Sequence, residues 1–246
     1  MARTGVINEP DLSAFNLKLI RLEFARLDIL IERQVQHWRS AGQDDEDVYR
    51  GLYISDAEID ALLERPLATG WGQGDSETSE SADEFNRALE KISRAIKEVE
   101  HEALSQGVQL RLRHMEAVFR LDAFERDVFM IAMAPLLDLR YERLFGYLQD
   151  DVTRKRPTVN LVLNLLCPPG TERYAKVKYF QDYARLVKNQ LIHKARESYE
   201  KEGLLNRPLG VEEPVYAWLL DQYQPSPSIA SLLRRVETGQ GVEAWA

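Results

Sequence analysis

The sequence contains few of the residues from which reactive sites are built. Its 246 residues include one cysteine and four histidines. A lone cysteine, Cys167, cannot form an internal disulfide or a cysteine-rich zinc site, and it is typical of a reducing compartment. No two histidines have the i, i+4 spacing of a helical zinc pair. We therefore expect no metal and no cofactor in this chain. The histidines are His37, His101, His114 and His193.

Long hydrophobic runs are missing as well. No stretch reaches the roughly 18 apolar residues that a membrane span needs. Residues 1–13 contain no apolar run of signal-peptide length. Together these absences predict a cytoplasmic protein that has no membrane partner.

Motifs of catalysis and nucleotide binding are also absent. There is no G-x-S-x-G turn, and no G-x-x-x-x-G-K-[ST] loop to hold ATP phosphates. The glycines of residues 70–74 are spaced like a phosphate turn, but they follow no strand and carry no lysine. The carboxylate pairs Asp122/Glu125 and Asp150/Asp151 are better explained by helix capping and turn formation than by acid–base chemistry. We therefore expect no enzymatic activity and no catalytic residue.

The charge balance is acidic. Asp and Glu number 40 against 32 Lys and Arg, which gives a formal net charge of −8. Phosphate binding needs concentrated Lys and Arg, so this balance argues against nucleic acid as the main partner. The acids gather in residues 44–100, whereas the region from Arg154 onward is locally basic.

Apolar residues at heptad spacing predict two long helices in the first part of the chain, over residues 11–39 and 83–105. Ser81 and Glu84 form an expected capping box for the second helix. A capping box at Ser55 and Glu58 predicts a short helix over 56–64. Residues 67–83 are rich in Gly, Ser and acids, which predicts a flexible linker. The heptad helices can pair antiparallel within one chain, or share a seam between subunits.

The second part of the chain predicts a run of shorter helices. They are expected near residues 110–121, over 123–137 and over 138–148, then from Pro157 to Leu166 after a charged turn at 150–156. Asp122 with Glu125 forms a capping box for the second of these helices. That helix is apolar on nearly every side, so it should be the buried centre. The tail after Gln224 is expected to fray.

One block of this region resembles a known module. Residues 124–168, FERDVFMIAMAPLLDLRYERLFGYLQDDVTRKRPTVNLVLNLLCP, look like the N-terminal region of a family of bacterial AAA ATPases that is often associated with contractile injection systems. The resemblance implies a mainly α chain. A helical hairpin or bundle over residues 1–106 would be followed by a variant winged-helix domain over 107–246. The segment 191–209 would be its wing, a small β-hairpin that turns near residues 200–203.

The resemblance also implies a function. In that family the region precedes an ATPase module, and this chain ends where that module would be expected to begin. We therefore expect a non-catalytic recruitment or adaptor domain that binds protein partners and, in a full-length protein, its own ATPase module. ATP hydrolysis is not carried over to this chain. The alternatives are a winged helix that binds nucleic acid and a helical scaffold that forms homo-oligomers.

Two groups of charged residues are candidates for specific roles. The first group is expected to form ion pairs that hold helices in register, and consists of Glu125, Arg126, Asp127, Arg140 and Arg143. The second group is a basic patch at the start of the helix-turn-helix-like segment, and consists of Arg154, Lys155 and Arg156. Farther along the chain lie more basic residues, namely Arg173, Lys176, Lys178, Arg185, Lys188, Lys194 and Arg196.

The helix expected after Pro157 has few side chains that could read DNA. Its only polar side chains are Thr158, Asn160 and Asn164, whereas a recognition helix presents Arg, Lys, Gln or Asn to base edges. We therefore expect this helix to be buried or to face a protein.

Overall fold

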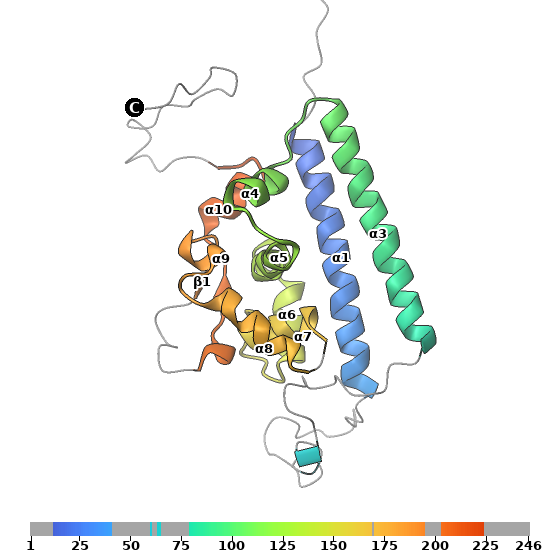
Figure 1. Cartoon of the computed structure of the whole chain (residues 1–246), viewed down its shortest axis with the longest axis vertical. Helices are drawn as coiled ribbons and strands as arrows, with labels where there is room; N and C mark the ends of the chain where they lie inside the picture. The colour runs from blue at the N-terminus through green and yellow to red at the C-terminus, as the bar shows by residue number, and fades with distance from the viewer. Residues whose placement is uncertain are drawn as a thin grey trace, which may run out of the picture.

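A computed structural model describes residues 12–40, 60, 63–64, 79–168, 170–194 and 203–223. Helices dominate these residues, which confirms the mainly α class (Figure 1). The predicted helix over 56–64, its Ser55/Glu58 cap and the tail after Gln224 lie wholly or largely outside the described residues. The elements are α1 (Leu12–Ser40), α3 (Ser79–Ser105), α4 (Arg111–Phe119), α5 (Ala123–Leu137), α6 (Arg140–Leu148), α7 (Val159–Leu166), α8 (Glu172–Lys176), η1 (Val177–Phe180), α9 (Arg185–Lys188), β1 (His193–Lys194), η2 (Leu204–Asn206), β2 (Leu209–Gly210) and α10 (Glu213–Leu219).

The two heptad helices pair antiparallel within one chain, as α1 and α3 (Figure 1). The prediction for α1 is confirmed to within one residue at each end. The start of α3 was predicted too late. Residues 79–83, assigned to the linker, are helical, so Ser81 does not cap the helix. Ser81 packs against α1 instead, where its hydroxyl donates to Gln36 Oε1 at 3.5 Å.

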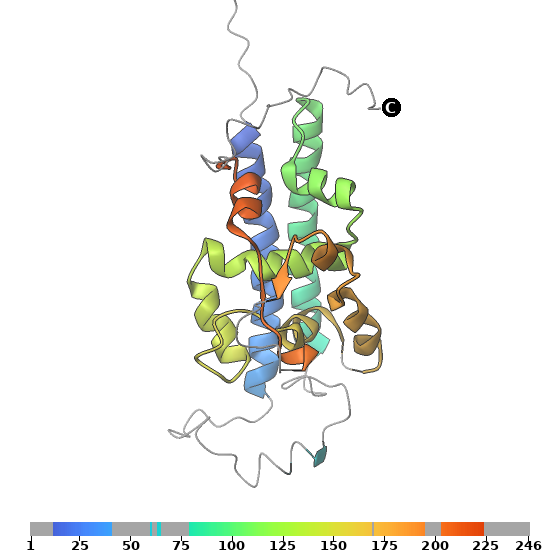
Figure 2. The same cartoon turned by 90° about the vertical axis from the view of Figure 1, so that its left-hand side faces the viewer.

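Helix α5 is the centre of the structure. It is seen end-on in Figure 1 and runs across the long helices in Figure 2. Its bounds are those predicted, and the capping box is present: the Asp122 carboxylate accepts from Glu125 N, and Glu125 accepts from Asp122 N. All seven residues from Val128 to Ala134 are buried. Pro135, which supplies no N–H of its own, lies in the last turn, and the helix ends at Leu137.

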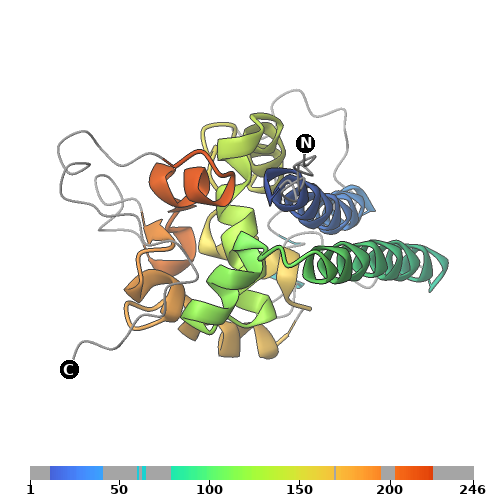
Figure 3. The ribbon, with the colours of Figure 1, turned by 90° about the horizontal axis from the view of Figure 1, so that it is seen from above.

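The helices are arranged in layers around α5. Figure 3 shows the two long helices on one side, α4 to α6 in the middle and the C-terminal elements on the other side. Helix α1 contacts α3 on one face and α4, α5, α6 and α7 on the other. One cluster of buried side chains therefore contains residues from α1 and α3 as well as from β2 and α10. The division at residue 106 stays a prediction, because this cluster draws on both sides of it.

Two short strands, β1 and β2, pair antiparallel in the C-terminal half, in the region predicted as the wing over residues 191–209. The predicted turn near residues 200–203 lies largely outside the described residues. In the register of the two strands, His193 pairs with Gly210 and Lys194 with Leu209. Thr158 bridges to Pro208, and Leu209 N donates to the Pro157 carbonyl at 2.8 Å. Pro157 therefore belongs to this extended pairing and does not start α7 as expected. The first helical residue is Val159, and the Thr158 hydroxyl caps the helix by accepting from Leu161 N.

A network of ion pairs joins α1 to α3, α4 and α5. Its centre is Glu23, whose side chain is 1% exposed and accepts from Arg26 at 3.0 Å and from Arg113 at 2.6 Å. Arg26 also binds Asp127 of α5. Arg113 of α4 also binds two further carboxylates, Glu100 and Glu116. Arg126 of α5 contacts Asp127 at 3.0 Å and Glu116 at 3.9 Å.

Opposite charges compensate for burial at the centre of this network. Burial by itself raises the pKa of the Glu23 carboxyl, but the positive charges of Arg26 and Arg113 outweigh it, so this pKa lies below its ordinary value. At Glu116 burial wins and the pKa is raised, although Arg113 and Arg126 oppose it. Glu23 is therefore held ionised, and it is the carboxylate that both arginines share.

Replacing Glu23 should destabilise the fold much more than breaking an exposed pair. We expect Glu23→Gln to cost about 3 kcal/mol of unfolding free energy. This is the low end for a broken buried pair, because Arg26 and Arg113 keep their other carboxylates. The matched control is Lys18→Gln, which breaks the pair with Glu102 between the same two long helices, where both side chains are about half exposed. That change should cost under about 1 kcal/mol. Urea unfolding at pH 7, followed by circular dichroism, measures both, and equal losses would contradict the central role of Glu23.

The same variant gives a prediction for pH dependence. Because the pKa of Glu23 is lower in the folded state than its ordinary value near 4.5, its stabilisation is present above that value. It is lost as the pH falls through the lowered folded-state pKa. The stability difference between wild type and Glu23→Gln should therefore shrink below about pH 4.5, while Glu116 titrates in both proteins. Urea midpoints measured from pH 7 down to pH 3 test this, and a constant difference would contradict it.

Candidate functional site

The basic patch predicted from the sequence lies on a turn between α6 and α7, and Gln149 holds this turn in place. The Gln149 side-chain amide donates to the carbonyls of Phe145, Arg154 and Arg156 at 3.1, 3.2 and 3.0 Å. Its oxygen accepts from Thr158 N at 3.0 Å. One half-buried side chain thus fixes both ends of the turn to the C-terminus of α6.

The acidic start of the turn adds further bonds. Asp151 accepts from the backbone N–H and the hydroxyl of Thr153 at 2.9 and 2.5 Å. Hydrogen bonds from Thr153, followed by the Arg154 charge, lower the pKa of the Asp151 carboxyl. The backbone packs closely on α6, because a Cβ at Gly146 would lie 3.3 Å from the Asp151 carbonyl oxygen. Asp150 and Asp151 therefore build a turn, as predicted for this pair from the sequence.

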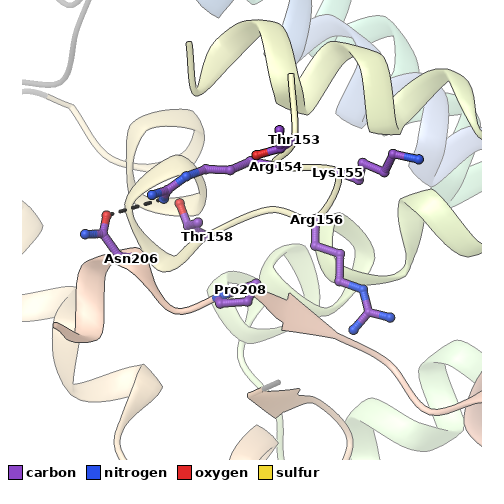
Figure 4. Close-up of a pocket in the computed structure, with 7 residues that line it drawn as sticks. All are labelled: Thr153, Arg154, Lys155, Arg156, Thr158, Asn206 and Pro208. Atoms are coloured by element: carbon purple, nitrogen blue, oxygen red, sulfur yellow. Dashed lines mark hydrogen bonds between the residues drawn. The ribbon is translucent and has the colours of Figure 1, made fainter. Parts of the chain in front are cut away.

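The turn borders a hollow of about 270 Å³ at the base of the hairpin (Figure 4). Arg154 reaches across it to Asn206 of η2 at 3.5 Å and also contacts Asp151 at 3.1 Å. Lys155 and Arg156 point away from Asn206 (Figure 4), and Lys155 lies 3.4 Å from Glu142. The lining residues are Thr153, Arg154, Lys155, Arg156, Thr158, Asn206 and Pro208.

Arg156 differs from its neighbours in the turn. Its side chain is exposed, and within the described part of the chain it has no ion-pair partner. A Cβ at Gly210 would lie 3.4 Å from the Arg156 guanidinium and 2.8 Å from the His193 ring. Because Gly210 has no side chain, the side chains of Arg156 and His193 have room beside it, next to the hairpin.

The predicted structural ion pairs are arranged as follows. Arg126 and Asp127 belong to the network around Glu23. Glu125 is 1% exposed, and its carboxylate lies 2.8 Å from the Arg185 guanidinium. Arg140 contacts Asp28 of α1 at 2.7 Å, next to a hydrogen bond from the Tyr141 hydroxyl to the same carboxylate. Arg143 is exposed and has no ion pair among the residues that the structure covers.

The segment after α7 consists of short helical elements, of which α8 and η1 follow each other directly. Helix α8 has five residues, η1 has four and α9 has four. Arg173 of α8, counted from the sequence among the basic residues of this half, is 6% exposed. It donates to the side chains of Asn160 and Asn164. The polar side chains of α7 are thus bonded within the protein, in agreement with the expectation that α7 is buried.

Other basic residues of this segment are also engaged internally. Lys176 lies over the rings of Phe124 and Tyr179, with its ammonium 4.8 and 5.3 Å from the ring centroids. Lys178 lies 5.6 Å from the centroid of Tyr179. Arg185 donates to the Arg120 carbonyl and binds Glu125. Of the remaining basic residues, Lys188 is exposed and Arg196 lies outside the described residues.

Reasoning from the sequence did not identify the long-range partners of the ion-pair network or the role of Gln149. The partner of Asp127 on α1, Arg26, is distant in the chain, and the signal for this network was a charged residue, Glu23, inside the apolar stripe of a heptad helix. Gln149 carries no such signal, because a glutamine beside a charged turn is ordinary on a surface.

In the described part of the chain no cluster of three His, Cys, Asp or Glu is arranged to bind a metal. Burial raises the pKa of the Cys167 thiol, which disfavours the reactive thiolate. No helix in the described ranges has the length and apolar character needed to cross a bilayer.

Comparison with known families agrees with this arrangement of helices and hairpin. The model of the family described as "Winged helix domain, variant" matches residues 14–233. Comparisons with curated proteins and with solved structures give no match. The matched range covers the elements from α1 to α10, the long helices included. The chain therefore belongs to the family of variant winged helix domains.

Proposed function

We propose that the chain is a non-catalytic adaptor that binds a protein partner and brings it to a AAA ATPase. The observation that carries this proposal is that cations of the segment after α7 are bonded within the protein. Arg173 is buried against α7, and Arg185 is bound to Glu125. What the surface offers a partner is a rigid turn, a shallow hollow and scattered apolar side chains, which fit a protein better than a phosphate backbone.

The short helical stretch after α7 is the second support. A helix-turn-helix protein places its second helix in the major groove, where several side chains reach base edges together. Helix α8 runs directly into η1, and together they span only Glu172–Phe180, about two to three turns. Such a short stretch presents few side chains to a groove at once, which supports a protein partner over DNA.

The link to an ATPase rests on the resemblance of residues 124–168 to the region that precedes AAA modules in one bacterial family. The chain has no phosphate loop of its own, so any ATP hydrolysis would be performed by a separate module. The partners of the adaptor are then that module and the protein recruited to it. A homo-oligomer that relies on the long helices is the weaker alternative, because their heptad faces already pair within one chain.

The first test is nucleic-acid binding. We expect no gel shift of a 20-base-pair DNA duplex at about 50 mM salt, where non-specific phosphate contacts are strongest. The control is the triple variant Arg154→Gln/Lys155→Gln/Arg156→Gln, which removes the exposed cations of the turn and should behave like wild type. A shift that weakens with salt and is absent in the triple variant would favour the nucleic-acid function instead.

The second test is association with an ATPase. We expect the chain to co-elute with the AAA module encoded with it, at a mass above that of either protein in light scattering. The chain alone should hydrolyse no ATP, because it lacks the phosphate loop and its lysine. A AAA module from an unrelated family is the control. Separate elution at micromolar concentrations of both proteins, or equal binding to the control module, would contradict the adaptor function.

A further inference from the structure

The hollow at the base of the hairpin combines a free cation with apolar side chains. Arg156 lines the hollow and has no ion-pair partner in the described ranges. Val152, which precedes the lining residue Thr153, is 89% exposed, and Leu205, which precedes Asn206, is 42% exposed. Aliphatic side chains left this open beside a concave surface gain from being covered by a partner.

The polar groups of the hollow are of the kind that binds a carboxylate. A guanidinium offers two parallel N–H donors that match a carboxylate, and such charge-assisted bonds are stronger than neutral ones. Lys155 adds a second positive charge, because its side chain is 65% exposed although its ammonium lies 3.4 Å from the Glu142 carboxylate. The amide of Asn206 faces the hollow from the other side (Figure 4).

The frame around the hollow is fixed before anything binds. Gln149 bonds the turn at the carbonyls of Arg154 and Arg156. Arg154 ties the turn to η2 through Asn206. The Pro157 carbonyl accepts from Leu209 N at 2.8 Å. A ligand that binds here therefore orders few side chains, which lowers the entropic cost of binding.

From this combination we infer that the hollow binds an acidic peptide segment that carries an aliphatic residue. The carboxylates bind Arg156 and Lys155, and the aliphatic residue covers Val152 and Leu205. A nucleic-acid strand fits less well. Its charged backbone gains nothing by covering exposed aliphatic side chains, and the turn offers few cations for its phosphates. This inference rests on the proposed adaptor function and names the chemistry of the recruited partner.

The test is fluorescence anisotropy with a labelled hexapeptide of two glutamates, leucine, valine and two glutamates, titrated with the full chain at about 50 mM salt. We expect a dissociation constant on the order of 0.1–1 mM, as is usual for one short peptide with few anchors. A peptide with lysine in place of glutamate, and one with serine in place of leucine and valine, should each bind at least about tenfold more weakly.

Variants on both parts of the hollow have matched controls elsewhere. Arg156→Glu and Val152→Asp should each lower the peptide affinity by about tenfold or more. Lys91→Glu on the outer face of α3 and Val118→Asp on α4 make the same changes at exposed positions remote in sequence from the turn, and should leave the affinity unchanged. Circular dichroism melting curves verify that all four variants fold.

The other possible outcomes separate a failure of this inference from a failure of the adaptor function. If no peptide binds while the chain still joins its AAA module, the inference is wrong and the adaptor function stands. If Arg156→Glu leaves the peptide affinity unchanged, the hollow is not the site and the inference is overturned. The same holds if the serine peptide binds as tightly as the original peptide. Preference for a DNA duplex over the acidic peptide overturns both the inference and the adaptor function.

Discussion

Helix α5 has seven consecutive buried residues, so it is stable in water only if other elements cover it on every side. This requirement places the rest of the structure. Helix α1 covers one side, and α6, α7 and β2 cover others. Burying an apolar side chain such as Phe129 or Ile131 contributes roughly 1.5–3 kcal/mol each. The long helices are therefore part of the core and not an independent arm, and the hairpin at the other end is anchored to the same helix.

The ion-pair network sets how α1 lies against this core. Apolar packing favours one position of a helix, and buried charges with partners on other helices restrict it further. Glu23 must reach Arg113 of α4 while it is 1% exposed, and Arg26, on the same helix as Glu23, must reach Asp127 of α5. A shift of α1 by one turn would separate both pairs, and leaving buried charges without these partners costs several kcal/mol. The network thus specifies register, whereas the apolar side chains supply most of the stability.

The sequence predicted the elements whose cause is local. The bounds of α5 follow from the Asp122 capping box and from its apolar composition, and α1 follows from its heptads. The sequence could not reveal that α3 begins at Ser79, because contact with α1 decides this against a polar, serine-rich composition. Nor could it reveal that Pro157 pairs with Leu209 instead of starting α7, or that Arg173 is buried. In each case the deciding partner lies on another element, and periodicity carries no information about such partners.

The same distinction explains why the basic residues of the second half are a poor guide to function when they are counted from the sequence. A cation contributes to phosphate binding only if its charge faces solvent, and Arg173, Arg185 and Lys176 are directed to amides, carboxylates and aromatic rings. Arg156 shares their charge but not their surroundings, because Gln149 and Gly210 position it at the surface without a carboxylate. The family supplies the scaffold, and the side chains that remain unpaired on it determine what the scaffold can bind.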